Sequence, residues 1–337
     1  MDSKRPLFTP VLIAGCLIIL VGFSIRASYG IFQIPIAEEF GWPRAEFSLA
    51  IAIQNLAWGF GQPIFGAIAE KIGDRKAIII GAILYSLGLI LSAGATTPLE
   101  HQIYEVLVGF GIAGTGFGVI LAVVGRASAD EHRSMSLAIA TAAGSSGQVI
   151  GPPIAVALLS IMSWQSVFLV FGVSILMTLF LLPFMRAPVS AGKEELEESM
   201  RDILKLAFND PSFSMIFLGF FSCGYQLAFI TAHFPALVTE MSSPIDPSGW
   251  CGPLGIQSTA ALGGFAISII GFSNILGTLA AGWAGKRYPK KWLLSGIYVG
   301  RSIAAIGFIL TPVSANSVLV FSFAMGFLWL ATVPLTS

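Results

Sequence analysis

Charged residues are scarce in this sequence. Only 11% of its 337 residues are Asp, Glu, Lys or Arg, against about 25% in an ordinary soluble domain. Hydrophobic residues make up 55% of the chain, and 26 residues are Phe. So few charges cannot cover the surface of a soluble globule or keep a chain disordered. The 18 basic and 18 acidic residues balance, which excludes the basic excess of a nucleic-acid-binding protein. The composition predicts an all-α, polytopic membrane protein.

Cysteine and the common catalytic motifs are also rare or missing. The three cysteines, Cys16, Cys223 and Cys251, form no CxxC pair and no Cys/His cluster with metal-ligand spacing. Neither a disulfide framework nor a metal site is therefore predicted. The sequence has no GxGxxG, Walker loop or HExxH, so we expect no cofactor, no ATP-driven transport within this chain and no enzymatic activity.

Long apolar runs predict ten membrane-spanning helices, because a helix needs about 20 apolar residues to cross a bilayer. They lie near 8–36, 47–69, 77–96, 103–125, 135–161, 164–185, 212–238, 260–285, 292–311 and 316–337. Proline- and glycine-containing segments punctuate the breaks, as at 41–44 and 242–249. Only Ser163 and Trp164 separate the fifth run from the sixth.

The basic residues predict an orientation for these helices. With the N-terminus inside, 15 of the 18 Lys and Arg residues fall in inside segments. Arg44 alone lies in an outside loop, while Arg26 and Arg301 lie within spans. Loops on the cytoplasmic side carry an excess of Lys and Arg. We therefore expect a multi-pass protein of the plasma or inner membrane with a cytoplasmic N-terminus.

The two halves of the chain repeat each other. A shift of 200 positions pairs Arg26 with Gln226, Gln33 with His233 and Pro35 with Pro235. The repeat predicts a six-helix bundle over 1–185, a cytoplasmic linker over 186–211 and a second, incomplete bundle of four helices over 212–337. Two further spans are expected to be missing after the tenth. Parallel repeats are typical of transporters whose site lies between the halves near the midplane.

One hairpin carries a family resemblance. The segment Gly66-Ala-Ile-Ala-Glu70-Lys71-Ile-Gly73-Asp74-Arg75-Lys76 resembles the G-x-x-x-D-R-x-G-R-K loop of the major facilitator superfamily, and 282–291 resembles its degenerate second copy. Both stand between the spans where that family has them. The resemblance covers the whole chain and implies a major facilitator fold of two pseudo-repeated helical bundles.

The same resemblance implies a cytoplasmic gate and a bent helix. The gate would be formed by Gly66, Glu70, Lys71, Gly73 and Arg75, with Arg126 or Arg133 as partners of Glu70. The segment from Gly147 through Gly151 to Pro152 resembles a motif of the family's antiporters and predicts a bend in the fifth span. Three positions depart from the pattern: Glu70 replaces an Asp, Asp74 stands where a basic residue is usual, and Glu105 replaces an Arg when Gly109 is aligned with the motif glycine.

A narrower resemblance concerns the substrate. The stretches starting at Arg26, Phe40 and Phe47, the His233-Phe-Pro segment and Arg301 are similar to bacterial monocarboxylate and oxalate/formate-type carriers. This resemblance implies a small organic anion as substrate.

The candidate substrate site consists of polar side chains in apolar spans, where a charge costs roughly 2.5–3.5 kcal/mol on insertion scales. A guanidinium can hold a carboxylate through two parallel hydrogen bonds, and no carboxylate is predicted at mid-depth to pair with it. The candidates are Arg26, Tyr29, Gln33, Gln54, Asn55, Gln226, His233 and Arg301. His233 could also take up a proton. For Arg301, pairing with backbone carbonyls stays an equal alternative, and interhelical hydrogen bonding alone would explain Gln54 and Asn55.

Together these features predict a monomeric secondary transporter. It would move a small, monocarboxylate-like organic anion through the lipid bilayer by alternating access, as proton symport or anion exchange. One alternative is a major facilitator exporter of hydrophobic or drug-like compounds, which the Gly147–Pro152 motif favours. A second is a truncated fragment that does not transport, or a membrane scaffold.

Overall fold

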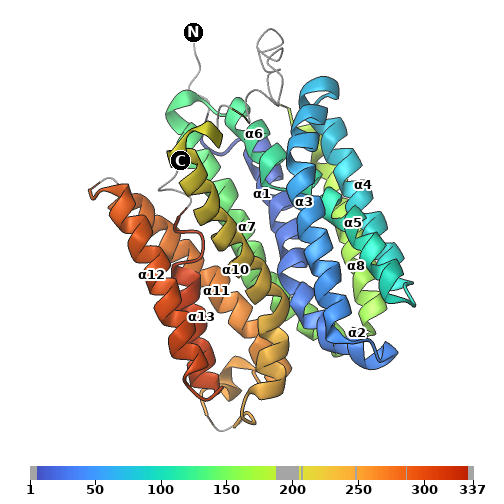
Figure 1. The fold of residues 1–337 in the computed structure, drawn as a ribbon. Helices are drawn as coiled ribbons and strands as arrows, with labels where there is room; N and C mark the ends of the chain where they lie inside the picture. The colour runs from blue at the N-terminus through green and yellow to red at the C-terminus, as the bar shows by residue number, and fades with distance from the viewer. Residues whose placement is uncertain (1–5, 187–204, 206–207, 247–248, 286, 333–337) are drawn as a thin grey trace.

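The computed structural model describes residues 6–186, 205, 208–246, 249–285 and 287–332 (Figure 1). The predicted linker over 186–211 lies almost entirely outside this part of the chain. The same is true of the last five residues of the tenth predicted span.

Helices account for every predicted span. The first half contains α1 (Pro10–Ser28), which continues through the short 3-10 turn η1 (Tyr29–Phe32) into α2 (Gln33–Phe40), then α3 (Arg44–Ile72), α4 (Asp74–Ala93), α5 (Pro98–Thr115), α6 (Phe117–Ala127), α7 (Asp130–Leu159), α8 (Trp164–Met177) and η2 (Thr178–Phe184). The second half contains α10 (Pro211–Met241), η3 (Gly252–Leu254), α11 (Thr259–Ala284), α12 (Lys290–Ile309) and α13 (Ala315–Phe327).

Eight helical segments of the described chain are long and apolar enough to cross a membrane. Two of the ten predicted spans differ from these eight. The 29-residue α3 is long enough but carries a polar face, and α13 is a shorter apolar helix of 13 residues. The prediction of an all-α, polytopic membrane protein is therefore confirmed, and each predicted span corresponds to a helix.

Local sequence explains where the helices break. Ser163 caps α8 by accepting a hydrogen bond from the Ser166 backbone N–H, so this residue does separate the fifth span from the sixth. Thr97 and Glu100 form a reciprocal capping box at the start of α5. Gly73, with φ of 100°, joins α3 to α4 in a backbone conformation that favours glycine.

The helices run alternately up and down between two ends (Figure 1). We call the end with the α3–α4 turn at Gly73 the hairpin end, because the predicted gate hairpin lies there. Both α1 and α10 begin at this end. We call the other end, with the α2–α3 turn at Gly41 and residues 242–246 and 249–258, the opposite end.

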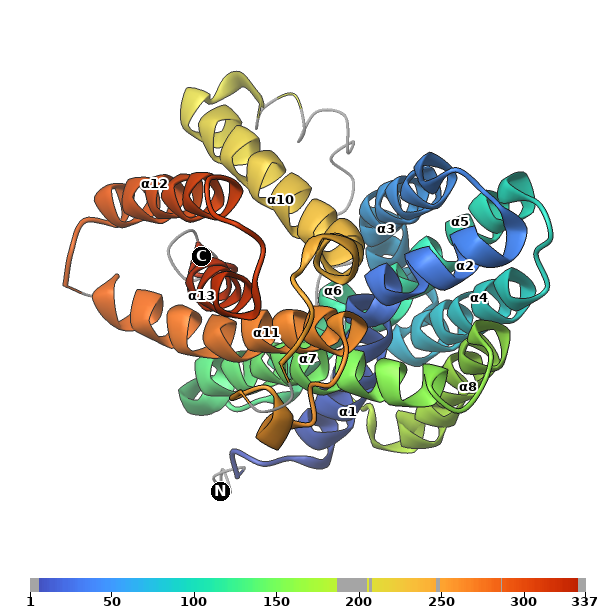
Figure 2. The same ribbon diagram turned by 90° about the horizontal axis from the view of Figure 1, so that it is seen from below.

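The two halves lie side by side and meet along two lines (Figure 2). On one line α7 packs against α11, and a Cβ at Gly271 would come within 3.1 Å of the Gln148 backbone carbonyl carbon. On the other line η1 packs against α10, where a Cβ at Gly30 would come within 2.2 Å of the Thr231 carbonyl oxygen. Only glycine permits backbones to approach this closely.

Candidate substrate site

A cavity of about 660 Å³ lies between the two halves. Its walls come from α1, α3, α6, α7, α10 and the segment after α13. Most of the lining is apolar or aromatic, as at Phe23, Phe117 and Phe221. Ligand pockets typically have volumes of about 300–1,000 Å³. The cavity is therefore large enough for an organic molecule bigger than formate.

Arg26 supplies a positive charge to this cavity. Its Nη2 donates a hydrogen bond to Asn55 Oδ1 at 3.1 Å, and its guanidinium carbon lies 4.6 Å from the centre of the Trp58 ring. The Arg26 Nε is buried and has no hydrogen-bond partner among the described residues. The guanidinium thus rests on an aromatic ring and an amide, without a carboxylate partner in the described chain.

Gln54, Tyr29 and Arg26 meet at a second, very small cavity. Its volume is about 10 Å³, and Asn55 also lines it. Gln54 and Tyr29 are both 2% exposed, so they lie behind the main cavity rather than in its wall. Of the eight predicted substrate residues, only Arg26 and Asn55 line the main cavity itself.

Gln33 and His233 meet at the junction between the halves. Gln33 Nε2 lies 3.5 Å from His233 Nδ1, and the His233 ring packs on Phe229 at 4.9 Å. Further toward the opposite end, Arg44 of α3 forms an ion pair with Glu240 of α10. Gln33 comes after the cavity-lining Arg26 in the first span, and His233 and Glu240 come after the cavity-lining Tyr225 along α10. The halves are therefore in contact on the opposite-end side of the cavity.

Arg301 and Gln226 lie together but outside the cavity. Arg301 is 1% exposed, and its Nε donates to the Leu328 carbonyl at 2.9 Å. Its Nη2 donates to the Leu328 and Trp329 carbonyls, and Gln226 Oε1 accepts from its Nη1 at 3.5 Å. Arg301 therefore satisfies the carbonyls at the end of α13, which is the structural alternative considered for it.

A fully buried carboxylate also lies in the first half. Glu105 on α5 is 0% exposed and accepts a hydrogen bond from Gln54 Nε2 at 2.6 Å. Glu105 stands near the start of a predicted span, and packing against α3 and α4 encloses its carboxylate within the first half. Among the described residues, no group of three His, Cys, Asp or Glu side chains could hold a metal ion.

Comparison with known families decides the identity of the fold. Residues 14–337 match the family described as Major Facilitator Superfamily. The chain belongs to this superfamily. Its members are transporters rather than enzymes, and the chain is a multi-pass membrane protein.

Individual relatives share low identity with the chain. It is 26% identical over 298 residues to the uncharacterized MFS-type transporter YcxA of Bacillus subtilis, covering 86% of this chain and 68% of that protein. It is 26% identical over 271 residues to monocarboxylate transporter 13 of Bos taurus, with coverages of 79% and 59%. It is 22% identical over 337 residues to the 4-hydroxybenzoate transporter PcaK of Pseudomonas aeruginosa, with coverages of 90% and 73%.

A solved structure shows the same fold. The xylose transporter XylE from E. coli, in a partially occluded inward open conformation, superposes with a TM-score of 0.71 at 15% identity. The match covers 97% of this chain and 86% of XylE. At this identity the likeness concerns the fold alone.

The gate hairpin of this major facilitator protein pairs differently from the expectation. Arg126 Nη2 donates to Asp74 Oδ1 at 2.6 Å, whereas Glu70 is exposed and makes no ion pair in the described chain. Asp74 is the first residue of α4 and points its carboxylate across to the end of α6. Glu70 lies one turn earlier, on the outer face of α3, so the predicted pairing of Glu70 with Arg126 is wrong.

The other predicted gate residues have varied surroundings. Arg75 donates to the Met185 and Pro183 carbonyls at 3.0 Å each, which ties α4 to the end of η2. Lys71 and Arg133 are exposed. A Cβ added at Gly66 would meet nothing within 4 Å, so no contact there requires a glycine.

The Gly147–Pro152 motif lies inside one continuous helix, α7. A Cβ at Gly147 would come within 2.4 Å of the Leu20 carbonyl oxygen, and one at Gly151 within 2.3 Å of the Ser24 carbonyl oxygen. These glycines therefore allow α7 to pack directly on the backbone of α1, the helix that carries Arg26.

Some cavity residues were missed at the sequence level. Thr141, Ser145 and Gln148 of α7 and Tyr225 of α10 line the cavity. The first three lie at positions i, i+4 and i+7, so they form one polar stripe on an apolar helix. That periodicity was available in the sequence and would have identified α7 as a wall of the site.

Proposed function

We propose that this protein is a secondary transporter that moves a small organic anion across the plasma membrane by alternating access. The substrate is a carboxylate with an apolar body. The observation that carries the proposal is Arg26: a cation in the wall of the central cavity, bonded to the neutral Asn55 and to no carboxylate of the described chain.

The chemistry of the cavity matches such a substrate. A guanidinium binds a carboxylate through two parallel hydrogen bonds, and Arg26 lines the cavity with no carboxylate of the described chain bonded to it. The aromatic walls would contact the rest of the molecule. An aromatic or branched monocarboxylate suits a cavity of about 660 Å³ better than formate or oxalate does.

The relatives support an anionic substrate at the level of class. Two of them are named for the transport of monocarboxylates and of 4-hydroxybenzoate, which is an aromatic carboxylate. Neither name fixes the substrate of this chain, because the identities are 26% and 22%.

Alternating access would use the two halves, 1–185 and 212–337, as the moving bodies. Arg44 and Glu240 would hold the opposite end closed in the state described here, and the gate hairpin, through Asp74 and Arg126, would act at the cytoplasmic end. We propose that the N-terminus is cytoplasmic, because the basic residues of the described chain gather at the hairpin end.

A second candidate function is export of hydrophobic or drug-like compounds. The apolar lining of the cavity favours it. The two functions differ in the role of Arg26, because a neutral compound lacks the charged pair of oxygens that a guanidinium binds through two parallel hydrogen bonds.

Uptake by proteoliposomes tests the proposal. The 337-residue chain is assayed with labelled benzoate and lactate, and with benzamide as a neutral compound of benzoate's size. We expect uptake of a carboxylate, no uptake of benzamide, and a loss of at least tenfold in apparent affinity in Arg26→Lys, which keeps the charge but loses the fork. The matched control is Arg287→Lys, since Arg287 also lies over a tryptophan, at 4.1 Å from the Trp283 ring centre, but away from the cavity. Uptake of benzamide with no response to any carboxylate would instead favour the exporter.

A further inference from the structure

The interior of the first half contains a polar cluster that the substrate site does not use. We infer that Glu105, with His101 beside it, binds one exchangeable proton, and that this proton site is linked to the anion site at Arg26. The link to the anion rests on the proposed function, whereas the proton site itself does not.

The cluster is centred on the Glu105 carboxylate. Oε2 accepts from Gln54 Nε2 at 2.6 Å, and Oε1 accepts from Ser92 Oγ at 3.3 Å. Oε1 also lies 4.0 Å from His101 Nε2, one helical turn away on α5. Among the described residues, the only basic group that pairs with Glu105 is this histidine, which is charged only when it is protonated.

Two buried polar atoms beside this carboxylate have no hydrogen-bond partner in the described chain. They are both ring nitrogens of His101. His101 is 1% exposed. Buried polar groups are nearly always hydrogen-bonded, so an unpaired buried imidazole needs an explanation. At 4.0 Å, His101 Nε2 and Glu105 Oε1 are too far apart for a direct hydrogen bond in this state, but a protonated Glu105 that moves toward the ring by about 1 Å would donate to the free nitrogen.

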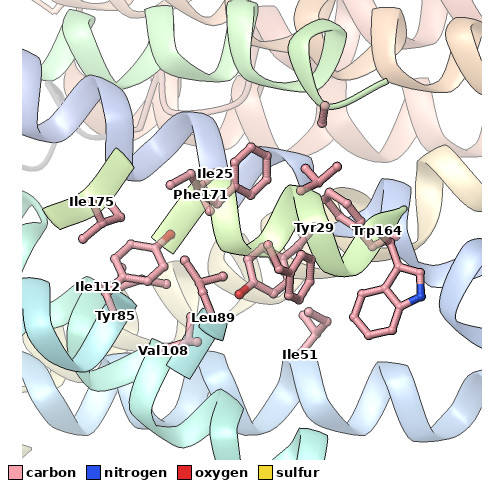
Figure 3. Packing of buried hydrophobic residues seen from close by; sticks show 14 of the residues in the cluster. Ile25, Tyr29, Ile51, Tyr85, Leu89, Val108, Ile112, Trp164, Phe171 and Ile175 are labelled. Carbon is pink, nitrogen blue, oxygen red and sulfur yellow. The ribbon is translucent and has the colours of Figure 1, made fainter. Parts of the chain in front are cut away.

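The surroundings hold few other ionisable groups. Arg26 comes from α1, Tyr29 from η1, Tyr85 from α4 and His101 from α5, while α3 contributes the uncharged Gln54. The two tyrosines lie in the apolar core drawn in Figure 3. Buried ionisable residues within spans are typical of proton pathways.

Two structural links connect this cluster to the anion site. On α3, Gln54 bonds to Glu105 and the next residue, Asn55, bonds to Arg26. The small cavity between Arg26, Tyr29 and Gln54 has a volume of about 10 Å³, which is close to the space that one water needs.

Charge balance then fixes the stoichiometry. Without substrate, Arg26 as a cation and Glu105 as a carboxylate sum to zero. When a monocarboxylate binds Arg26, one proton from the aqueous phase forms an O–H bond on Glu105, and the sum stays zero. When the anion leaves, the same O–H bond breaks and the proton returns to water. Each anion would therefore cross the apolar interior with one proton and no net charge, which corresponds to proton symport rather than anion exchange.

Infrared spectroscopy of the reconstituted full chain tests the proton site directly. Across a pH series without substrate, the wild type should show a protonated-carboxyl band that Glu105→Gln removes. The matched control is Glu46→Gln, because Glu46 also accepts a hydrogen bond from a glutamine, Gln102, at 2.7 Å, but lies in the first turn of α3. Arg26→Gln should increase the protonated fraction at each intermediate pH, since the balancing cation is gone.

The outcomes separate the two proposals. Added benzoate should raise the band in the wild type and leave Arg26→Gln unchanged. Gln54→Leu, which removes a hydrogen-bond donor to the Glu105 carboxylate, should also raise the protonated-carboxyl band. This variant tests the proton site if Glu105→Gln does not insert into the membrane. A pH-dependent band that persists unchanged in Glu105→Gln, or one that does not respond to Gln54→Leu or Arg26→Gln, would overturn the proton site. Failure of carboxylate uptake alone would overturn the proposed function and leave the substrate-free titration standing.

Discussion

Gln33 and His233, which are 200 positions apart in the chain, face each other across the junction of the two halves at 3.5 Å. The same shift of 200 relates them in the internal repeat. Pro35 and Pro235, another repeat-related pair, line one shared hollow of about 290 Å³ near the opposite end. Equivalent residues of a two-fold repeat meet where the pseudo-symmetry axis passes, so the axis runs through this junction.

The ion pair at the opposite end should regulate access to the junction. A cysteine placed at Gln33, which is 2% exposed, reports opening through its rate of labelling by a membrane-impermeant maleimide. We expect Glu240→Gln to raise this rate roughly 1.4-fold to fivefold, because an exposed ion pair contributes only about 0.2–1 kcal/mol.

Two further variants complete that experiment. Glu38→Gln, at an exposed position of α2, should leave the labelling rate unchanged. Exchanging the two charges in Arg44→Glu with Glu240→Arg should restore the original rate. Equal labelling in wild type and Glu240→Gln would show that the pair does not hold this end closed.

Gly30 should be essential for closing the junction. A Cβ there would come within 2.2 Å of the Thr231 carbonyl oxygen and 2.8 Å of the Ala232 carbonyl oxygen, and both are backbone atoms that cannot move aside. We expect Gly30→Ala to increase labelling at position 33 more than Glu240→Gln does. Gly59→Ala is the control, because a Cβ at Gly59 meets nothing within 4 Å. If both alanine variants behave like the wild type, the backbones do not approach as closely as described.

Arg301 should matter for stability and not for substrate affinity. Its guanidinium donates to the Leu328 and Trp329 carbonyls, and hydrogen bonds from a charged donor contribute about 1.5–3 kcal/mol each. We expect Arg301→Gln to lower the free energy of unfolding by roughly 3 kcal/mol, measured by thermal unfolding in detergent. A variant of normal stability that binds carboxylates poorly would return Arg301 to the substrate site.

The hairpin contact should depend on Asp74 and not on Glu70. Asp74 pairs with Arg126 and also lies in the first turn of α4, where a negative charge favours the helix. Asp74→Asn should therefore cost roughly 1–2 kcal/mol of stability, whereas Glu70→Gln should cost almost nothing. Thermal unfolding of the two variants side by side decides this, and the reverse order would support the pairing expected from the sequence.

The sequence contained enough information for the fold but not for the details of the site. Apolar runs and turn residues mark every helix, because the bilayer imposes length and hydrophobicity on each span separately. Arg26 stood out for the same reason, since a charge in a span is costly wherever it lies. Which polar residues share a cavity depends on how each helix is rotated about its own axis relative to its neighbours. The sequence of a single span does not specify that rotation.

Arg301 and Glu105 illustrate the limit. Both are buried ionisable side chains. The sequence patterns left the role of Arg301 open and assigned no role to Glu105. The Arg301 guanidinium donates hydrogen bonds to the carbonyls of Leu328 and Trp329, which lie 27 and 28 residues further along the chain. Glu105 is surrounded by groups from α3, α4 and η1 that only the tertiary packing brings together. Asp74 replaced Glu70 as the partner of Arg126 because the turn at Gly73 reverses the chain between them.

Calorimetric titration of benzoate into the purified chain tests the central role of Arg26 most directly, because it measures binding without requiring transport. Wild type and Arg287→Lys should bind with the same affinity, and Arg26→Lys should bind at least tenfold more weakly while unfolding at the same temperature. Equal affinity of wild type and Arg26→Lys for the carboxylate would contradict an anion site at Arg26.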